Sequence, residues 1–316
     1  MNILFTCVGR RVELMQAFRN AADITGIDLY IHGTDMTETA PALMYCDVKH
    51  KAPGIKEESY IPTLMSICEK EKIDAVIPTI DTDLLILAQN KEKFEQIGTK
   101  VFISAEDKIV ICRDKRNTGE FFEHCGLKAP KTIDDVEKYN LGFPCFIKPK
   151  DGSSSIFAYK AVNMEELVHY ASQVPDYIIQ PFVEGTEYTV DVFCDYDGNP
   201  VYITPRIRLA VRAGEVLKTE IVQDEKIIAE TMEVIKKFKP CGAITLQLIR
   251  DNLSGENYYI EINPRYGGGA PLSIKAGADS ATAMLKILNG ETVSYQTGAA
   301  ENGAIYSRFD QSIRVN

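Results

Sequence analysis

Several side chains that can bind metal-linked phosphates lie close together near the end of the sequence. Glu261, Asn263 and Arg265 alternate along a predicted strand, so their side chains project to one face. Mg²⁺ prefers oxygen ligands and usually shares them with substrate phosphates, which a guanidinium also binds. Gln247 lies on the preceding predicted strand and faces Glu261 if the two strands form a hairpin. Each residue alone fits a strand-ending turn or an exposed strand position, but the combination favours a site.

A second candidate is a lysine at the end of a predicted strand, followed by a loop of small residues. Lys148 ends the strand, and the loop behind it contains Gly152 and three serines, Ser153, Ser154 and Ser155. Backbone N–H groups of such a loop can surround nucleotide phosphates while the lysine neutralises their charge. An ordinary hairpin with a solvated lysine explains the motif equally well. The loop does not follow the Gly-x-x-x-x-Gly-Lys-Ser/Thr pattern, which disfavours a P-loop enzyme.

Two further segments indicate nucleotide binding only when they are considered together with these motifs. The polar link from Gln180 to Glu187 joins two predicted strands. Its backbone can meet an adenine edge and Glu187 can accept hydrogen bonds from ribose, whereas a β-turn with solvated acids is the simpler interpretation. Lys115, at the start of a predicted helix, can reach a phosphate, although a lone lysine there is usually a solvated charge.

Candidate substrate residues follow from a basic strand and a glycine run. Arg206, Arg208 and Arg212 alternate, and they share one face if the strand runs that far. Three cations there suit a carboxylate or an acyl phosphate, and a solvated face paired with acids is the alternative. Gly268 is the middle of three glycines after Arg265, where the backbone can approach a ligand closely; a plain flexible loop is the alternative.

The elements that must position these residues change in character along the chain. Strands predicted at 2–8, 28–33, 75–78 and 100–103 alternate with helices at 11–22, 60–72 and 81–89, which indicates a mainly parallel sheet. One long helical stretch is predicted at 106–124. From Pro144 onward, strands joined by tight turns such as Asp197-Gly198-Asn199-Pro200 predict antiparallel pairing.

In the first unit, two strand-to-helix turns lie where open parallel sheets bind ligands. One spans Thr6 to Arg11 and lacks the Gly-x-Gly-x-x-Gly fingerprint of a dinucleotide site. That absence disfavours an oxidoreductase of the Rossmann type. The other turn carries Asp81 and Asp83, which we interpret as helix caps, with contact to an amine substrate as the alternative.

Composition excludes several classes of protein. The chain has 316 residues, of which 45% are hydrophobic and 25% charged, and a net charge of −10, which repels nucleic acid and anionic membranes. Eight scattered cysteines include no Cys-x-x-Cys pair, so we expect reduced thiols in a cytoplasmic protein rather than a zinc site. Apolar runs stay well short of the roughly 20 residues that span a membrane.

The order and spacing of these motifs resemble the ATP-grasp superfamily. Lys115, Lys148 with its loop, the link after Gln180, and Gln247 with Glu261-x-Asn263-x-Arg265 occur in the family's order. The chain is most similar to a single synthetase unit of the carbamoyl-phosphate synthase large subunit and to related carboxylate–amine ligases. The resemblance implies an α/β plus α+β fold. A Rossmann-like pre-ATP-grasp domain at 1–105 would precede a two-lobed ATP-grasp fold, with a small lobe and linker helices at 106–183 and a C-terminal lobe with the metal site at 184–316.

The resemblance also implies roles for individual residues. Lys115 and Lys148 would contact ATP phosphates, beneath a loop containing Ser153, Ser154 and Ser155. Gln180, where many members have an acid, would meet the adenine amino group, and Glu187 would bind ribose. The backbone of Phe182 and Val183 would contact adenine. Two Mg²⁺ ions (or Mn²⁺) would be held by Gln247, Glu261 and Asn263. Arg265 would stabilise the transferring phosphate.

The implied reaction uses ATP to convert a carboxylate into an acyl phosphate, which a nitrogen nucleophile then displaces. The expected partners are small-molecule carboxylate and amine substrates and, at most, a second copy of the chain as a homodimer. Two alternatives remain open. One is an enzyme like carbamoyl-phosphate synthase, although the family's full enzyme carries two such units. The other is a non-catalytic ATP-binding regulatory module.

Overall fold

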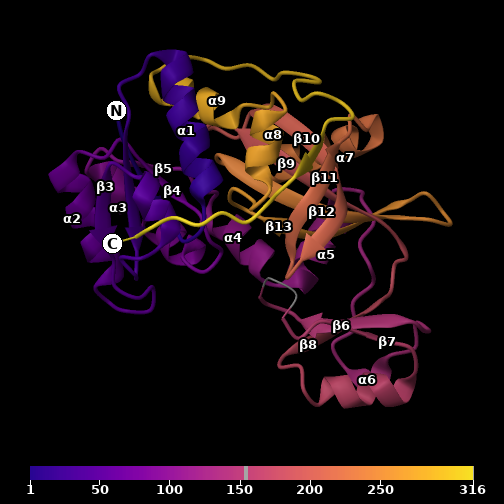
Figure 1. Cartoon of the computed structure of the whole chain (residues 1–316). Helices are drawn as coiled ribbons and strands as arrows, with labels where there is room; N and C mark the ends of the chain where they lie inside the picture. The colour runs from indigo at the N-terminus through magenta and orange to yellow at the C-terminus, as the bar shows by residue number, and fades with distance from the viewer. Residues whose placement is uncertain (153–155, 316) are drawn as a thin grey trace.

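In the computed structural model, which describes residues 1–152 and 156–315, three β-sheets organise the described chain (Figure 1). The first is a five-stranded sheet in the order β3-β2-β1-β4-β5. Its parallel pairing is as the sequence predicts, whereas the edge strand β3 was not predicted. Its strands are β1 (Asn2–Thr6), β2 (Tyr30–Asp35), β3 (Val48–Lys51), β4 (Ala75–Pro78) and β5 (Lys100–Val101). Its helices are α1 (Val12–Thr25), the short η1 (Pro41–Tyr45), α2 (Tyr60–Glu71) and α3 (Leu84–Gln96).

The strand order of this sheet reverses between β1 and β4. Helical connections leave β1 toward β2 on one side and β4 toward β5 on the other, so their carboxyl ends form a crevice of the kind in which such sheets bind ligands. The turn before α1 and the turn before α3 both open onto this crevice.

The helical linker differs from the single helix predicted at 106–124. It forms α4 (Glu106–Arg113) and α5 (Lys115–His124), separated at Asp114. Asp114 has an extended backbone, and its side chain accepts a hydrogen bond from the Arg116 amide, which starts a new helix. An N-cap residue needs that non-helical backbone, so the prediction of one continuous helix was wrong.

A small three-stranded antiparallel sheet, in the order β7-β6-β8, forms a separate lobe at the lower right of Figure 1. It consists of β6 (Cys145–Pro149), β7 (Tyr159–Ala161) and β8 (Tyr177–Pro181), with η2 (Val136–Lys138) and α6 (Met164–Ala171). The alternate strand residues Cys145 and Ile147 are buried in its own small core with Leu167 of α6.

A six-stranded sheet in the order β13-β12-β9-β10-β11-β14 fills the third region. β12 pairs antiparallel with β9 on one side and with the edge strand β13 on the other, and β10 and β11 extend as a long hairpin. Strands β11 and β14 were not predicted, and α8 begins directly after the three glycines at 267–269. The elements are β9 (Gly185–Cys194), β10 (Pro200–Arg212), β11 (Glu215–Ile221), α7 (Glu225–Phe238), β12 (Ala243–Asp251), β13 (Asn257–Asn263), α8 (Ala270–Lys275), α9 (Ser280–Leu288) and β14 (Ile305–Ser307).

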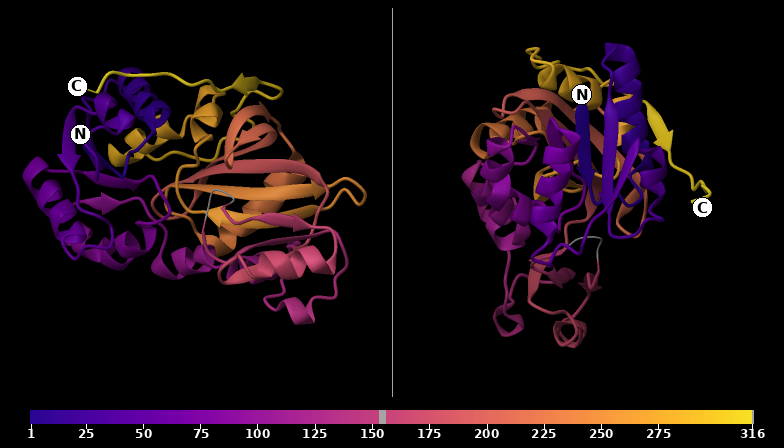
Figure 2. Two further views of the ribbon diagram at one scale, coloured as in Figure 1. Left: turned by 60° about the horizontal axis from the view of Figure 1, so that its bottom comes forward. Right: turned by 90° about the vertical axis from the view of Figure 1, so that its left-hand side faces the viewer.

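The first and third regions share one hydrophobic core. Met15 and Phe18 of α1 are fully buried in a cluster that also contains Met284 and Leu285 of α9, and the Phe18 ring meets Tyr266 edge-on at 6.1 Å between centroids. From β14 the chain returns to the first domain, as both views in Figure 2 show. This packing fixes the turn before α1 next to the segment that follows β13. The domain boundaries at 105 and 183 stay predictions.

Among the described residues, no helix combines the length and apolar character needed to cross a membrane. All eight cysteine thiols are free.

Candidate active site

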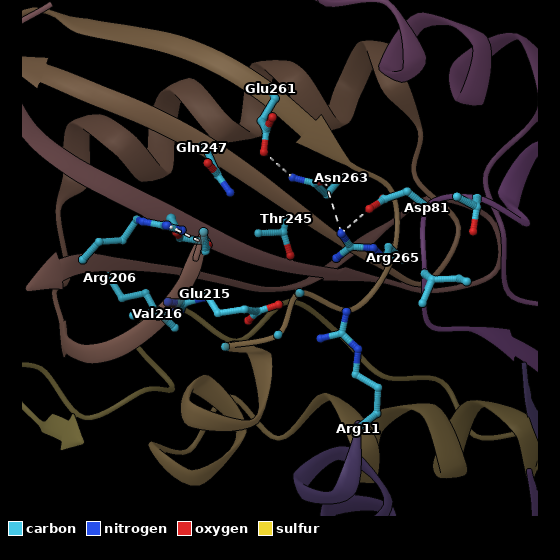
Figure 3. A pocket seen from close by; sticks show the side chains of 18 residues that line it. Arg11, Asp81, Arg206, Glu215, Val216, Thr245, Gln247, Glu261, Asn263 and Arg265 are labelled. Atoms are coloured by element: carbon cyan, nitrogen blue, oxygen red, sulfur yellow. Dashed lines mark hydrogen bonds and ion pairs between the residues drawn. The ribbon is translucent and has the colours of Figure 1, made fainter. Parts of the chain in front are cut away.

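Two adjoining cavities lie where the three regions meet, and they share one wall. The outer cavity, about 590 Å³, lies between the small sheet, α5 and the centre of the large sheet. The inner cavity, about 240 Å³, lies between the large sheet and the first domain (Figure 3). Both cavities are lined by Arg208, Gly214, Gln247 and Glu261.

The outer cavity brings together the two lysines expected at phosphates. Lys148 ends β6 with only 8% of its surface exposed. Burial lowers the pKa of its ammonium to about 8, against the opposing effect of Glu261 and with a further lowering by Lys115. The Lys115 ammonium lies 2.8 Å from the Gly152 carbonyl oxygen. A desolvated cation at a cavity wall favours an anionic ligand, which fits the phosphates of ATP. Ser153, Ser154 and Ser155 lie outside the described residues.

The link between β8 and β9 forms another wall of the outer cavity, with Gln180, Phe182, Val183 and Glu187 all lining it. Buried Gln180 donates from Nε2 to Thr132 Oγ1 at 2.9 Å, which turns its amide oxygen the other way. The Phe182 N–H donates to the Pro144 carbonyl at 3.1 Å. The Phe182 N–H is therefore already used. Of the backbone contacts to adenine expected from Phe182, only the one through its carbonyl oxygen can form.

The residues expected to hold magnesium meet on β12 and the edge strand β13 of the large sheet. Gln247 of β12 and Glu261 of β13 are direct partners in the antiparallel register, which confirms the predicted hairpin. Asn263 Nδ2 donates to Glu261 Oε1 at 2.9 Å. The described residues contain no cluster of three or more His, Cys, Asp or Glu side chains. One carboxylate and two amide oxygens are nevertheless hard donors, which suits Mg²⁺ shared with phosphate.

Arg265 joins this set to the first domain. Its guanidinium binds the Asp81 carboxylate and lies 3.4 Å from Asn263 Oδ1 and 3.1 Å from the Tyr266 carbonyl oxygen (Figure 3). Its Nε is buried without a hydrogen-bond partner among the described residues. Asp81 thus belongs to the inner cavity and orients Arg265 across the domain boundary.

The interpretation of Asp81 and Asp83 as helix caps was wrong. Asp83 stands at the N-cap position of α3, but its side chain makes no capping bond. Instead it is fully buried and accepts hydrogen bonds from Thr6 Oγ1 at 2.6 Å and Tyr60 Oη at 3.0 Å. Burial raises the pKa of Asp83 to about 6, against the opposing effect of these bonds.

The three arginines of β10 do not share one environment. Arg206 is 2% exposed, with its Nε 2.7 Å from Asp191 Oδ2. Arg208 lines both cavities, with its Nε 3.2 Å from Glu187 Oε2. Arg212 is exposed, pairs with Asp310 at 2.9 Å and lines neither cavity. The strand register with β11 shifts between Arg208 and Val211, so strict alternation ends there and the expectation for Arg212 was wrong.

The glycine run allows the backbone to approach other groups closely, but these groups are side chains of the inner cavity. A Cβ on Gly268 would lie 2.0 Å from the Glu215 carboxylate, and one on Gly269 would lie 2.5 Å from the Arg206 guanidinium. Sequence reasoning did not single out Glu215, nor Arg11 of the first domain, which also lines the inner cavity. The position of Arg11 in a strand-to-helix turn was the available signal for it.

Residues 112–269 match the family described as ATP-grasp domain, and residues 3–102 match the one described as PylC-like, N-terminal domain. The chain therefore belongs to the ATP-grasp family, which confirms the resemblance drawn from its motifs. Proteins of this family are ATP-dependent ligases that use ATP and Mg²⁺.

Relatives of known name agree with this assignment. The chain is 25% identical over 266 residues to the carbamoyl phosphate synthase large chain of Clostridium acetobutylicum, an alignment that covers 75% of this chain and 24% of the relative. It is 26% identical over 300 residues to the same protein of Pasteurella multocida, covering 83% and 28%. The chain thus spans about a quarter of the length of these relatives.

Solved structures share the fold at low identity. A biotin carboxylase–β,γ-ATP complex from Campylobacter jejuni gives a TM-score of 0.76 at 18% identity, covering 96% of this chain and 74% of that one. An N5-carboxyaminoimidazole synthetase from Staphylococcus aureus complexed with ADP gives 0.75 at 16%, covering 93% and 78%.

Proposed function

We propose that the chain transfers the γ-phosphate of ATP to a carboxylate substrate and then joins the acyl group to a nitrogen nucleophile, releasing ADP and phosphate. The shared wall supports this proposal most directly. Gln247, Glu261 and Arg208 border both cavities, so a nucleotide in the outer cavity and a carboxylate in the inner one would meet there. Holding two reactants in this way removes much of the entropic cost of their encounter.

In the first step a carboxylate oxygen attacks the γ-phosphorus, the bond to the β,γ-bridging oxygen breaks, and ADP leaves. In the second step the nitrogen lone pair attacks the acyl carbon, phosphate leaves with the bonding electrons, and the nitrogen loses a proton. Both reactants of the first step are anionic. Lys148, Arg208 and Arg265 line the two cavities and would offset this repulsion and the charge of the transferring group.

The proposed nucleotide contacts follow the walls of the outer cavity. Adenine would lie against the link at Gln180, Phe182 and Val183, and the phosphates would extend toward Lys115 and Lys148. Glu187 would bind ribose only by exchanging its ion pair with Arg208 for hydroxyl groups.

Gln247, Glu261 and Asn263 would hold magnesium, which offsets phosphate charge when bound. We propose two ions, replaceable by manganese, because three oxygen-bearing side chains exceed what one phosphate-bound ion usually takes from protein. We also propose a homodimer as the assembly, by analogy with the domain dimer of Hydrogenobacter thermophilus 2-oxoglutarate carboxylase; light scattering tests it.

The test is a screen for ADP release from Mg-ATP with amino acids and small carboxylates, alone and with amine partners. An active acid labelled with ¹⁸O in its carboxylate should pass one label to the released phosphate. Activity without label transfer would exclude the acyl phosphate. Bicarbonate with ammonia is the arm for carbamoyl-phosphate synthesis, and ATP binding without ADP release in any arm would indicate a regulatory module.

A further inference from the structure

Among the described residues, Arg11 is the arginine lining the inner cavity that has no acid partner. The other three are each held by an acid: Arg206 by Asp191, Arg208 by Glu187 and Arg265 by Asp81. No described residue makes a hydrogen bond or ion pair with the Arg11 side chain.

Its surroundings make this isolation unusual. Arg11 is partly buried and lines the inner cavity, where its guanidinium points toward Arg265 and Glu215 (Figure 3). Burial lowers the pKa of Arg11 to about 10, with a further lowering by Arg265 and opposing effects of Glu215 and Asp81. The nearby Glu215 carboxylate is already shared with Arg308 at 3.5 Å. A partly desolvated guanidinium that has lost water without gaining an acid favours an anionic ligand.

Arg11 also lies away from the place of phosphoryl transfer. Arg11 lines the inner cavity but not the outer one, whereas Gln247 and Glu261 border both cavities. In Figure 3 the Arg11 side chain enters from α1 on the side opposite these two residues. Its backbone is fixed, since its N–H donates to the Val8 carbonyl at 2.9 Å and α1 is anchored in the shared core.

We propose that Arg11 binds a second, non-reacting acid group of the carboxylate substrate, so that the ligase selects a small acceptor with two anionic groups. This inference rests on the proposed function. One acid group would react at the shared wall, and the other would bind Arg11 through a bidentate, charge-assisted contact. The 240 Å³ of the inner cavity limits the acceptor to a small metabolite. Carboxylate and phosphate both have the required oxygen geometry.

The experiment measures ligand binding separately from turnover. Malonate, inorganic phosphate and acetate are titrated calorimetrically into the enzyme saturated with Mg-ADP, for wild type, Arg11→Ala, Arg11→Lys and Arg10→Ala. Arg10 is the matched control, because it is the adjacent arginine but its side chain is 85% exposed and its contact with Asp310 is 3.7 Å. Circular dichroism and thermal melting establish that each variant is folded.

Wild type and Arg10→Ala should bind malonate or phosphate with equal Kd, and more tightly than acetate. Arg11→Ala should weaken binding of the dianion by about 10- to 100-fold, the loss typical of a charge-assisted hydrogen bond. It should also abolish the preference for the dianion over acetate. Arg11→Lys should lie between them. Inorganic phosphate, which is a single anionic group, tests whether Arg11 also binds phosphate oxygens. Equal Kd values for wild type and Arg11→Ala, or no dianion binding by wild type, would overturn the proposal.

Turnover separates the two proposals. Once an active acceptor is known, Arg11→Ala should raise its KM by a similar factor and leave the KM for ATP unchanged. If no carboxylate releases ADP but malonate binding still depends on Arg11, the proposed ligase reaction fails and the anion site stands. If turnover is normal and neither KM nor Kd responds to Arg11→Ala, the anion site fails and the ligase reaction stands.

Discussion

The two cavities share a wall but are assembled in different ways. The outer cavity is lined by residues of short, consecutive motifs, such as Lys148 with Gly152 and the link from Gln180 to Glu187. The inner cavity combines side chains as far apart in sequence as Arg11, Asp81 and Arg265. A nucleotide site built from local motifs can be recognised in a sequence. A site for the second reactant, built by packing one domain on another, depends on the whole fold.

Their cations also differ in how the protein holds them. Lys148 is buried and, among the described residues, has no acid within ion-pairing distance. In the inner cavity Arg206 and Arg265 are each held by an acid, whereas Arg11 has no acid partner among the described residues. The outer cavity is thus suited to a highly charged ligand, and the inner one to positioning a small one. The predictions below test this difference.

Lys148→Met should have the largest effect on activity. It removes a desolvated cation that would stabilise the transferring phosphate, so kcat/KM should fall by about 10²–10³-fold. Thermal stability should not fall, because a buried charge disappears. Steady-state kinetics and melting curves check both. The control is Lys160→Met: this lysine lies over the Phe182 ring at 3.9 Å and does not line the cavity. An equal loss in both variants would contradict a specific role for Lys148.

The same lysine predicts a pH dependence. Its folded-state pKa of about 8 lies below its ordinary value of 10.5, so the unfolded chain binds more protons between these values. The contribution of Lys148 to stability therefore rises with pH across this window. Phosphate binding needs the protonated form, so the KM for ATP should rise above about pH 8. A flat profile in wild type would contradict the assignment, and Lys148→Arg should remove the rise.

Arg206→Ala should mainly lower the stability of the protein. The Asp191 carboxylate would stay buried with Ser273 Oγ at 2.6 Å but without its cation. Loss of one partner of such a pair costs about 3–5 kcal/mol. The double variant Arg206→Leu with Asp191→Leu should recover most of this, which chemical denaturation can measure. A loss below about 1 kcal/mol would show that Arg206 is held chiefly for substrate.

Two aspartates from one turn should separate activity from stability. Asp81→Asn loosens Arg265 and should lower kcat about tenfold, the value of one charged hydrogen bond, with little change in melting temperature. Asp83→Ala leaves the Thr6 and Tyr60 hydroxyls buried without their acceptor. It should cost about 2–4 kcal/mol of stability and change kcat of the folded enzyme little. Exchanged outcomes would mean that Asp83, rather than Asp81, serves the site.

The sequence predicted what local pattern determines. The alternation of strands with helices predicted the parallel sheet. The sequence also predicted that Gln247 faces Glu261 if their strands form a hairpin, which they do. The break at Asp114 was predicted only in part. Lys115 was placed at the start of a helix, but the stretch at 106–124 was still predicted as helical throughout, because helical spacing continues on both sides of Asp114. Strand β11 was also missed, since apolar and polar residues do not alternate along Glu215–Ile221.

The inner cavity could not be predicted in this way. Arg11 and Glu215 enter it only because α1 packs on α9 and because β11 pairs with β10. Asp81 looks like a helix cap in sequence, and its pairing with Arg265 spans 184 residues. A bulge that displaces Arg212 has no marker in the alternating sequence. These contacts depend on tertiary packing, which short-range pattern does not encode.

Arg212→Ala should have the smallest effect. Its exposed ion pair with Asp310 contributes little, because solvent screens such pairs and both side chains lose freedom in forming them. We expect a kcat/KM within about twofold of wild type and a free energy of unfolding within about 1 kcal/mol of it. Arg208→Ala is the matched comparison from the same strand, since Arg208 borders both cavities and should cost at least tenfold in kcat/KM. Equal losses at the two positions would mean that Arg212 turns inward during the reaction. The inner cavity would then extend along β10 beyond the bulge, and its contrast with the outer one would have to be redrawn.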